Sequence, residues 1–414
     1  MNTKTITNIL NDTDFIRTGG SAEELRAAEY LMQQAEKAGA SAHIETFPVQ
    51  MADIEDAELL INGKPIPCKG YKNCGSGSVE KELVYLPNTD RASLFAVKDK
   101  IVLLDSGISY WVYKDLTDAG AAGIITYDGN VNFRDNDIDA KELRGFVAEA
   151  AEGKKTLAVN INAKDAVRIV KSGAKTAKIT IRQEESVGES RNVVAEIPGS
   201  TDEWVILTAH YDSTSLSHGA YDNMTGCIGL LGIMEEMADS APNRYGLRFI
   251  FCGSEERGLL GSKAYVEAHK DELDKAVLNI NLDMIGSIMG KFISVVSAEE
   301  ALVHYIRYIA LETGWGLDAR QGVYSSDSTP FADAGIPAVS FARIAGGSLA
   351  PIHNRYDTKA VVSPTQLKED IDFLAYFTDR MANAVVCPVS REIPDNVKED
   401  LDVYLNRKRK KVQH

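Results

Sequence analysis

The second half of the chain alternates apolar, strand-like runs with helix-like segments, and this alternation restricts the fold more than any other feature. The strand-like runs span 205–208, 247–252, 277–282, 292–296 and 338–341, and the helical patterns span 223–239, 258–270, 298–313 and 363–386. Strands that alternate with helices predict an α/β fold, with a mostly parallel mixed sheet sandwiched by helices. In such sheets, binding sites form beyond the carboxyl ends of the strands.

The first half of the chain has a different character. Residues 22–39 have the apolar stripe of an amphipathic helix, with Ser21 and Glu24 as a capping box and Gly39 as its stop. From about 52 to 187 the chain reads mainly as short strands and turns. We therefore expect one domain made of 1–51 and 188–395, a β-rich insertion over 52–187, and a basic C-terminal tail over 396–414.

Composition excludes some classes of partner. A formal net charge of −15 over 414 residues argues against nucleic acid, because phosphate binding needs a basic surface. No apolar run approaches the ~20 residues of a membrane span, so no membrane association is expected. The first eight residues lack the apolar core of a secretory signal, which favours a cytoplasmic protein over a secreted one whose leader was removed. Oligomeric state is not readable from the sequence.

Acids and histidines cluster where the apolar runs end. They are His210, Asp212, Asp222, Glu255, Glu256, Asp283 and His353. A charged residue at the end of a buried strand is costly unless it is paired or bound to a metal. Seven such residues in one half of the chain indicate a metal centre, and their pattern suggests two ions.

Each of these residues also has an ordinary structural interpretation. His210 and Asp212 point the same way in an extended chain, so the imidazole can bind a metal while Asp212 accepts its other N–H, or the two can simply share a hydrogen bond. Asp222 precedes a helix and fits a helix cap equally well. Glu255 and Glu256 fit either a solvated acidic loop or a metal ligand beside a general base.

The order of these residues resembles the motif order of the co-catalytic di-zinc aminopeptidase family. That family includes secreted bacterial leucyl aminopeptidases, glutamate carboxypeptidase and the non-catalytic transferrin receptor. The similarity covers about residues 15 to 50 and 188 to 390, and its motifs are 210–212, 219–226, 255–256, 282–284 and His353. It implies that Asp222 bridges two Zn²⁺ ions. His210 and Asp283 would complete one site, and Glu256 and His353 the other. Glu255 would be the general base, and Asp212 would orient His210.

The resemblance implies a zinc-dependent exopeptidase that removes the N-terminal residue of a peptide with a free N-terminus, through a di-zinc-bound hydroxide and a glutamate base. A di-zinc dipeptidase or carboxypeptidase-like hydrolase, or a non-catalytic binding protein of the same fold, is the alternative. Residues 100–105 and 119–127 are similar to a protease-associated domain, which in this family is inserted ahead of the metal-binding strands.

The chain departs from the family pattern near the substrate side. Ser326-Asp327-Ser328 stands where Ser-Asp-His is frequent, and Thr225 replaces a serine after the bridging aspartate. Tyr324 either polarises a substrate carbonyl or only packs, and His218 is expected to be a loop histidine. The sequence therefore leaves the substrate-side wall and the preferred N-terminal residue open.

Overall fold

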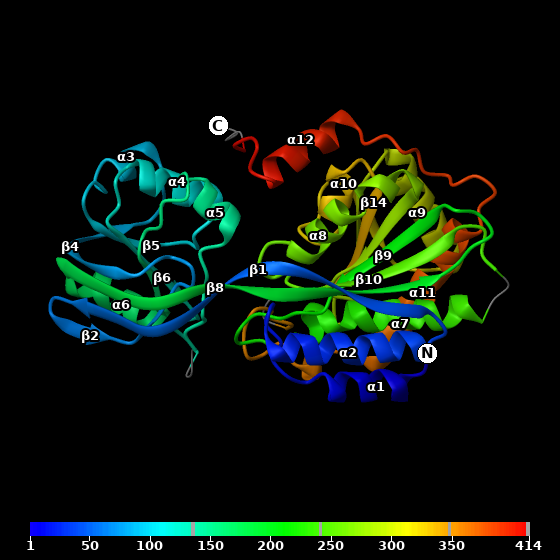
Figure 1. Ribbon diagram of the computed structural model, residues 1–414, viewed down its shortest axis with the longest axis horizontal. Coiled ribbons are helices and arrows are strands. Elements are labelled where there is room, and N and C mark those ends of the chain that lie inside the picture. The colour runs from blue at the N-terminus through cyan, green and yellow to red at the C-terminus, as the bar shows by residue number, and fades with distance from the viewer. Residues whose placement is uncertain (134–136, 240–241, 347–348, 411–414) are drawn as a thin grey trace. The chain divides into compact units, whose positions relative to one another are not determined.

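The computed structural model describes residues 1–133, 137–239, 242–346 and 349–410. The chain separates into two compact units (Figure 1). Unit 1 joins Met1–Pro48 to Glu189–His414, and unit 2 is the intervening Val49–Gly188. Each unit has its own hydrophobic core.

Unit 1 is built on a sheet whose central strands run parallel. In sheet order these strands are β14 (Ala338–Ile344), β11 (Ala276–Leu282), β9 (Trp204–His210) and β10 (Gly246–Cys252). On one side β12 (Lys291–Ser297) pairs antiparallel with β14 and parallel with β13 (Asp318–Gln321). On the other side β8 (Thr176–Ile197) runs antiparallel to β10. The predicted α/β class with a mostly parallel mixed sheet is confirmed.

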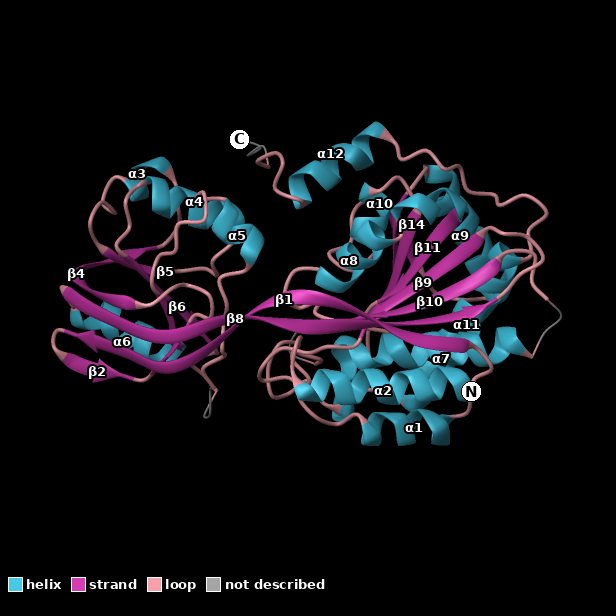
Figure 2. Cartoon of the chain, viewed as in Figure 1, coloured by secondary structure: helices cyan, strands magenta, loops and turns pink. Residues whose placement is uncertain are grey.

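Helices cover both faces of this sheet (Figure 2). The larger core includes residues of α1 (Thr3–Asp12), α2 (Ala22–Lys37), α7 (Thr225–Ala238), α9 (Glu300–Thr313) and α11 (Pro364–Ala382). The opposite face carries α8 (Leu260–Ala268), α10 (Ser328–Asp333) and α12 (Asp395–Tyr404). Successive side chains of β9 point to opposite faces of the sheet, so Leu207 packs in the first core and Ile206 in the second.

The glycines of α7 let this helix approach its neighbours closely. A Cβ on Gly226 would lie 2.4 Å from the carbonyl oxygen of Leu282, and one on Gly229 would lie 2.8 Å from the Leu282 side chain. A Cβ on Gly232 would lie 2.7 Å from Ile371 on α11. The glycine spacing therefore serves close packing.

Two helices at the ends of unit 1 were not expected. Asn2 caps α1 through its side chain, which accepts a hydrogen bond from the Thr5 amide. The range 396–414, expected to be a basic tail, contains most of α12, because Val397 and Leu401 lie four residues apart and bury together. Residues 411–414 of the expected tail lie outside the described residues.

Unit 2 contains parallel strands and more helix than the sequence suggested. The strands β4 (Gly77–Leu86), β5 (Ile101–Leu104), β6 (Gly123–Asp128) and β7 (Ala158–Asn162) pair in parallel, and β3 (Cys68–Gly70) pairs antiparallel with β7. The long β1 (Ser41–Ile61) pairs with β2 (Lys64–Ile66) and with β8. The helices are α3 (Arg91–Leu94), α4 (Tyr110–Asp118), α5 (Gly145–Glu149) and α6 (Ala163–Ser172). That unit 2 is a protease-associated domain stays a prediction.

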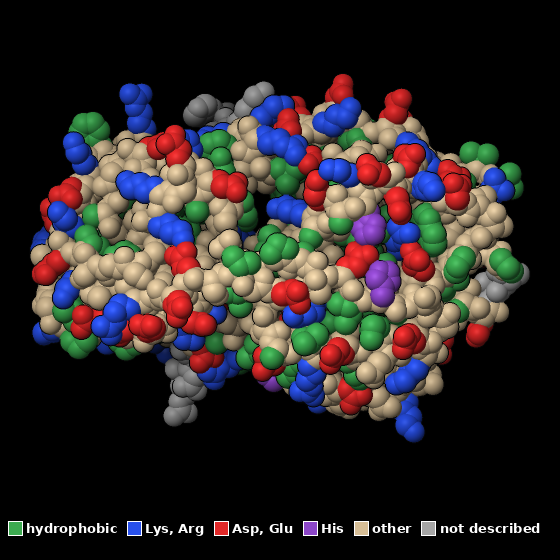
Figure 3. Space-filling model, viewed as in Figure 1, with side chains coloured by type: hydrophobic (Ala, Val, Ile, Leu, Met, Phe, Trp, Pro, Cys, Tyr) green, Lys and Arg blue, Asp and Glu red, His purple; other side chains and the backbone are tan. Residues whose placement is uncertain are grey.

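The drawn face of the surface carries charges of both signs (Figure 3). On the face drawn in Figure 3, acidic and basic side chains are interspersed, and no broad basic field appears. Within the described residues, no helix has the length and apolarity that crossing a membrane would need.

Candidate metal centre

The acids and histidines singled out by the sequence follow four neighbouring parallel strands. His210 is the last residue of β9, and its register partner on β10 is Cys252, after which Gly253 and Ser254 turn the chain into Glu255. Asp283 directly follows β11, and His353 lies in the loop that follows β14. Because the carboxyl ends of parallel strands meet at one edge of the sheet, these side chains converge there.

The converging side chains form two groups that share one residue. In the first, one ligand atom each from His210, Asp222 and Asp283 lies within 4.8 Å of the others. In the second, Asp222, Glu256 and His353 meet the same distance criterion. His210 Nε2 lies 3.1 Å from Asp222 Oδ1, and His353 Nε2 lies 3.1 Å from Asp222 Oδ2. The two oxygens of Asp222 therefore face different groups.

The segment that carries Asp222 is held against β11 by its neighbour. Asp222 lies in the irregular turn η1 (Ala220–Met224), and the peptide bond between Asp222 and Asn223 is cis. The Asn223 side chain donates to the carbonyl oxygen of Leu282 at 2.8 Å and accepts from the Met284 amide at 3.0 Å. These bonds flank Asp283, so Asn223 ties the Asp222 turn to the strand end that carries Asp283.

Asp212 holds the backbone of the glutamate pair. Its fully buried carboxylate accepts from the Glu255 amide at 2.9 Å and from the Glu256 amide at 3.2 Å. His210 Nδ1 lies 3.5 Å from Asp212 Oδ1, which is at the outer limit of a hydrogen bond. Asp212 therefore fixes the backbone of the two glutamates, a role that the sequence did not suggest. That Asp212 also orients His210 stays a prediction.

Ion pairing dominates the electrostatics of the two histidines. Burial opposes charge on His210, but Glu255, Asp212, Asp222 and Asp283 together hold its pKa well above the ordinary value. Burial likewise opposes charge on His353, yet hydrogen bonds to Asp222 and Glu256 raise its pKa to about 11. Burial would raise the pKa of Asp222, but the two histidines outweigh it and lower that pKa. These carboxylates therefore favour the protonated form of each histidine.

The glutamates behave in the opposite way. Burial raises the pKa of Glu255 well above its ordinary value, and the nearby charges of Glu256, Asp327 and Asp283 add to this rise against the opposing effect of His210. Burial also raises the pKa of Glu256, reinforced by Asp222. Carboxyl groups with raised pKa values are suited to proton transfer near neutral pH.

Four buried charged residues around this centre were not among the site residues expected from the sequence. They are Arg17, Glu24, Asp327 and Asp357. Burial and the charge of Asp212 raise the pKa of Glu24 to about 7, and burial raises that of Asp327 to about 6. Their burial depends on tertiary packing, which no local pattern reveals. The one sequence feature that connects Asp357 with the site is its position four residues after His353.

The remaining candidates lie beside the two groups or away from them. Burial raises the pKa of Tyr324 strongly, with Asp283 and Asp222 adding to the rise. Asp327, in the Ser-Asp-Ser motif that differs from the family pattern, accepts a hydrogen bond of 2.6 Å from the Ser262 hydroxyl. His218 lies 2.6 Å from Asp14 and belongs to neither group, as its interpretation as a loop histidine predicts.

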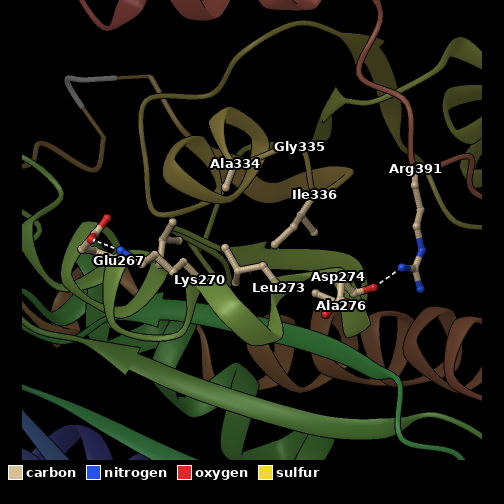
Figure 4. Close-up of a pocket in the computed structure, with 10 residues that line it drawn as sticks. Glu267, Lys270, Leu273, Asp274, Ala276, Ala334, Gly335, Ile336 and Arg391 are labelled. Atoms are coloured by element: carbon tan, nitrogen blue, oxygen red, sulfur yellow. Dashed lines mark hydrogen bonds and ion pairs between the residues drawn. The ribbon is translucent and has the colours of Figure 1, made fainter.

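A hollow elsewhere in unit 1 has different chemistry. It encloses about 530 Å³ beside the first residue of β11, between Leu273, Ile336 and Arg391 (Figure 4). Its location at the amino end of β11 is opposite to the edge where the acids and histidines converge. Arg391, which lines it, pairs with Glu203 at 2.6 Å. The convergent titratable groups therefore make the carboxyl edge the better candidate for chemistry.

Part of the chain is similar to known peptidases. Residues 192–378 match the model of Peptidase family M28. Aminopeptidase YwaD of Bacillus subtilis is 39% identical over 144 residues, 33% of this chain and 31% of its own. Leucine aminopeptidase 2 of Arthroderma otae is 32% identical over 245 residues, 56% of this chain and 47% of its own. The chain thus spans about a third to a half of these relatives.

Solved structures share the whole fold. The zinc aminopeptidase BSAP from Bacillus subtilis superposes with a TM-score of 0.77 at 22% identity, covering 96% of this chain and 98% of its own. An aminopeptidase from Aneurinibacillus sp. strain AM-1 gives a TM-score of 0.72 at 24% identity, over 93% and 95% of the two chains. The matched residues 192–378 contain the four central strands and every acid and histidine of the two groups. Residues 192–378 of the chain are thus similar to peptidase family M28.

Proposed function

We propose that this protein is a zinc-dependent aminopeptidase with two metal ions per chain. The observation that carries the proposal is the sharing of Asp222 by two three-residue groups, with Glu255 beside the ligand Glu256. A carboxylate with one oxygen toward each group is suited to bridge two ions. The names of the family and of the similar aminopeptidases support the same activity.

The residues fit zinc chemically. Each group offers one imidazole nitrogen and carboxylate oxygens, a donor set that Zn²⁺ accepts. Asp283 Oδ1 is buried and accepts no hydrogen bond among the described residues, as expected of a ligand atom. His210, Asp222 and Asp283 would hold one ion, and Asp222, Glu256 and His353 the other. When bound, a zinc pair supplies Lewis acidity that lowers the pKa of a water and polarises a carbonyl oxygen.

The chain's own groups would then handle the proton. Asp212 fixes the Glu255 amide at 2.9 Å, so the Glu255 carboxylate starts from a rigid backbone. Glu255 takes a proton from the attacking water and delivers it to the amine nitrogen of the leaving peptide. Its sheltered position and its raised pKa suit a group that must both accept and release a proton. We assign Glu255 as the general base and acid.

Tyr324 is the proposed hydrogen-bond donor to the substrate. Because its pKa is raised strongly by burial and by Asp283 and Asp222, its hydroxyl stays protonated throughout the neutral range. A protonated phenol beside the acids can donate to the carbonyl oxygen of the bond that is cleaved, which stabilises the negative charge that develops there.

Hydrolysis of aminoacyl-anilides tests the proposal. We expect the zinc-loaded protein to release the anilide from substrates with a free α-amine and to leave the N-acetylated forms intact. Exhaustive chelation should abolish the activity, and zinc alone should restore it. Full activity in a chelated protein shown to hold no metal would contradict the proposal. Two tightly bound zinc ions without turnover on any free-amine substrate would instead favour a binding protein of the same fold.

Metal binding is also expected to release protons. A histidine binds zinc only when neutral, whereas the pKa of His353 is about 11 in the metal-free protein and that of His210 is also raised. At pH 7.5 both are therefore protonated before zinc binds, and we expect about two protons or more per chain to leave on saturation. Calorimetric titration in buffers of different ionisation enthalpy measures this number. Histidines with an ordinary pKa near 6.5 would together release only ~0.2 protons.

A matched variant tests the origin of these protons. His353→Ala should bind one zinc ion less tightly and release about one proton fewer. An unchanged proton count in that variant would contradict the assignment of His353 as a cation in the metal-free state.

A further inference from the structure

A buried carboxylate links the loop of His353 to the turn of Asp222. Asp357 is fully buried and lies four residues beyond His353. Its Oδ1 accepts from the Tyr221 amide at 2.8 Å, and its Oδ2 accepts from the Asp222 amide at 3.2 Å. Oδ2 also accepts from the Ser217 hydroxyl at 3.0 Å. Asp357 therefore holds the backbone of the residue that both metal groups share.

A buried arginine bonds other backbone groups of the same segment. Arg17 is fully buried, and its guanidinium donates to the carbonyl oxygens of Tyr211, His218 and Gly219. In the described part of the chain, every hydrogen bond of this side chain ends on a backbone carbonyl oxygen. The backbone of Arg17 adds a bond of 3.1 Å from its amide to the Ser213 hydroxyl.

These two residues hold complementary parts of one backbone stretch. Arg17 holds carbonyl groups and Asp357 holds amide groups, so segment 211–222 is fixed between a cation and an anion. Neither side chain is a member of the two metal groups. A buried charge is costly unless it is fully hydrogen-bonded, and an apolar residue would fill the same space at lower cost. This cost argues for a task beyond packing.

We propose that Asp357 is a positioning residue that sets the distance between Asp222 and His353, with Arg17 as its counterpart at the carbonyl groups of segment 211–222. This inference rests on the proposed function, because its effect passes through the metal ions. Asp357 follows His353 on one loop and bonds the amide of Asp222, so a shift of either ligand is transmitted to the other. Ligand distances at a zinc site tolerate only ~0.2 Å of error, so such coupling affects metal affinity directly.

Asp357→Asn is the sharpest test. The side chain keeps its size, but only one of its two terminal atoms remains an acceptor, and its new N–H group faces a backbone N–H. We expect the weaker of the two zinc ions to lose about 10- to 100-fold in affinity, as is typical when groups that support metal ligands are removed. Competition with a chromophoric chelator, titrated against zinc, measures both stepwise affinities.

Two further variants separate positioning from general stability. Ser217→Ala removes the hydroxyl that donates to Oδ2 and accepts from the Gly219 amide, but it leaves both backbone bonds to Asp357, so it should weaken the same zinc ion by a smaller factor. Val397→Ala truncates a buried side chain of α12, away from segment 211–222, and should lower thermal stability with both zinc affinities unchanged.

The outcomes distinguish this inference from the proposed function. Wild-type zinc affinities in both Asp357→Asn and Ser217→Ala overturn it, as does an equal loss of affinity in Val397→Ala. A wild-type protein that binds no zinc overturns the proposed function, and this inference with it. Two tight zinc ions in the wild type, a selective loss in Asp357→Asn and a graded loss in Ser217→Ala support both.

Discussion

Glu255→Gln is expected to lower kcat by about 10²- to 10⁴-fold while both metal ions stay bound. The amide keeps the size of the side chain and the backbone bond to Asp212, but it can neither accept a proton from water nor deliver one to the leaving amine. Because Glu255 is a member of neither metal group, its replacement should leave zinc content unchanged. Steady-state hydrolysis of an aminoacyl-anilide, with zinc analysis of the same sample, measures both quantities.

The neighbouring glutamate provides the control for this prediction. Glu256 lies 3.2 Å from His353 in the second group, so Glu256→Gln should lose one zinc ion together with activity. If Glu255→Gln lost metal and Glu256→Gln kept it, the proposed roles of the two residues would have to be exchanged.

Asp222→Asn is expected to bring zinc content from two ions per chain to nearly none and activity to background. Asp222 is the one residue common to both groups, and each of its oxygens lies 3.1 Å from a different histidine. Asparagine retains one weakly basic oxygen, so it cannot serve both ions. Metal analysis after gel filtration, combined with thermal unfolding with and without added zinc, measures the loss. Zinc at 1,000 times its Kd should stabilise the wild type by about 4 kcal/mol and this variant far less.

Asp283→Asn is the matched variant for Asp222. Asp283 belongs to the first group alone, so its loss should spare the ion held by Glu256 and His353. Two ions kept by Asp222→Asn, or a larger loss of zinc from Asp283→Asn than from Asp222→Asn, would contradict the bridging role of Asp222.

The sequence predicted those features that local patterns encode. Apolar runs ending in acids and histidines marked β9, β10 and β11, and a parallel arrangement implied that their carboxyl ends meet. His210, Asp222 and Asp283 do lie together in the structure. The glycines of α7 allow close packing, because each of them lacks a side chain where a neighbour lies against the helix.

The features that escaped prediction depend on contacts between distant residues. Arg17 bonds Tyr211, 194 positions further along the chain, and Asp357 bonds Asp222, 135 positions before it. The amide bonds of Asp212 to the glutamates were missed because a carboxylate next to a histidine suggests the histidine as its partner. In unit 2, α6 follows β7 directly and is capped by Asn162, so the sequence has no turn residues that mark the start of the helix.

The discontinuity of unit 1 has a consequence for the order of folding. The 140 residues of Val49–Gly188 separate α1 and α2 from α7 and α11, with which they share a core. Closing an unstructured loop of this length costs about 4 kcal/mol in chain entropy, and prior folding of the intervening unit removes most of that cost. During synthesis the apolar faces of the first two helices therefore stay exposed until the later segments of unit 1 are made. Arg17 of this early segment bonds the stretch that leads to Asp222, and His353 comes from a late segment, so we expect the metal groups to be among the last parts of the protein to be completed.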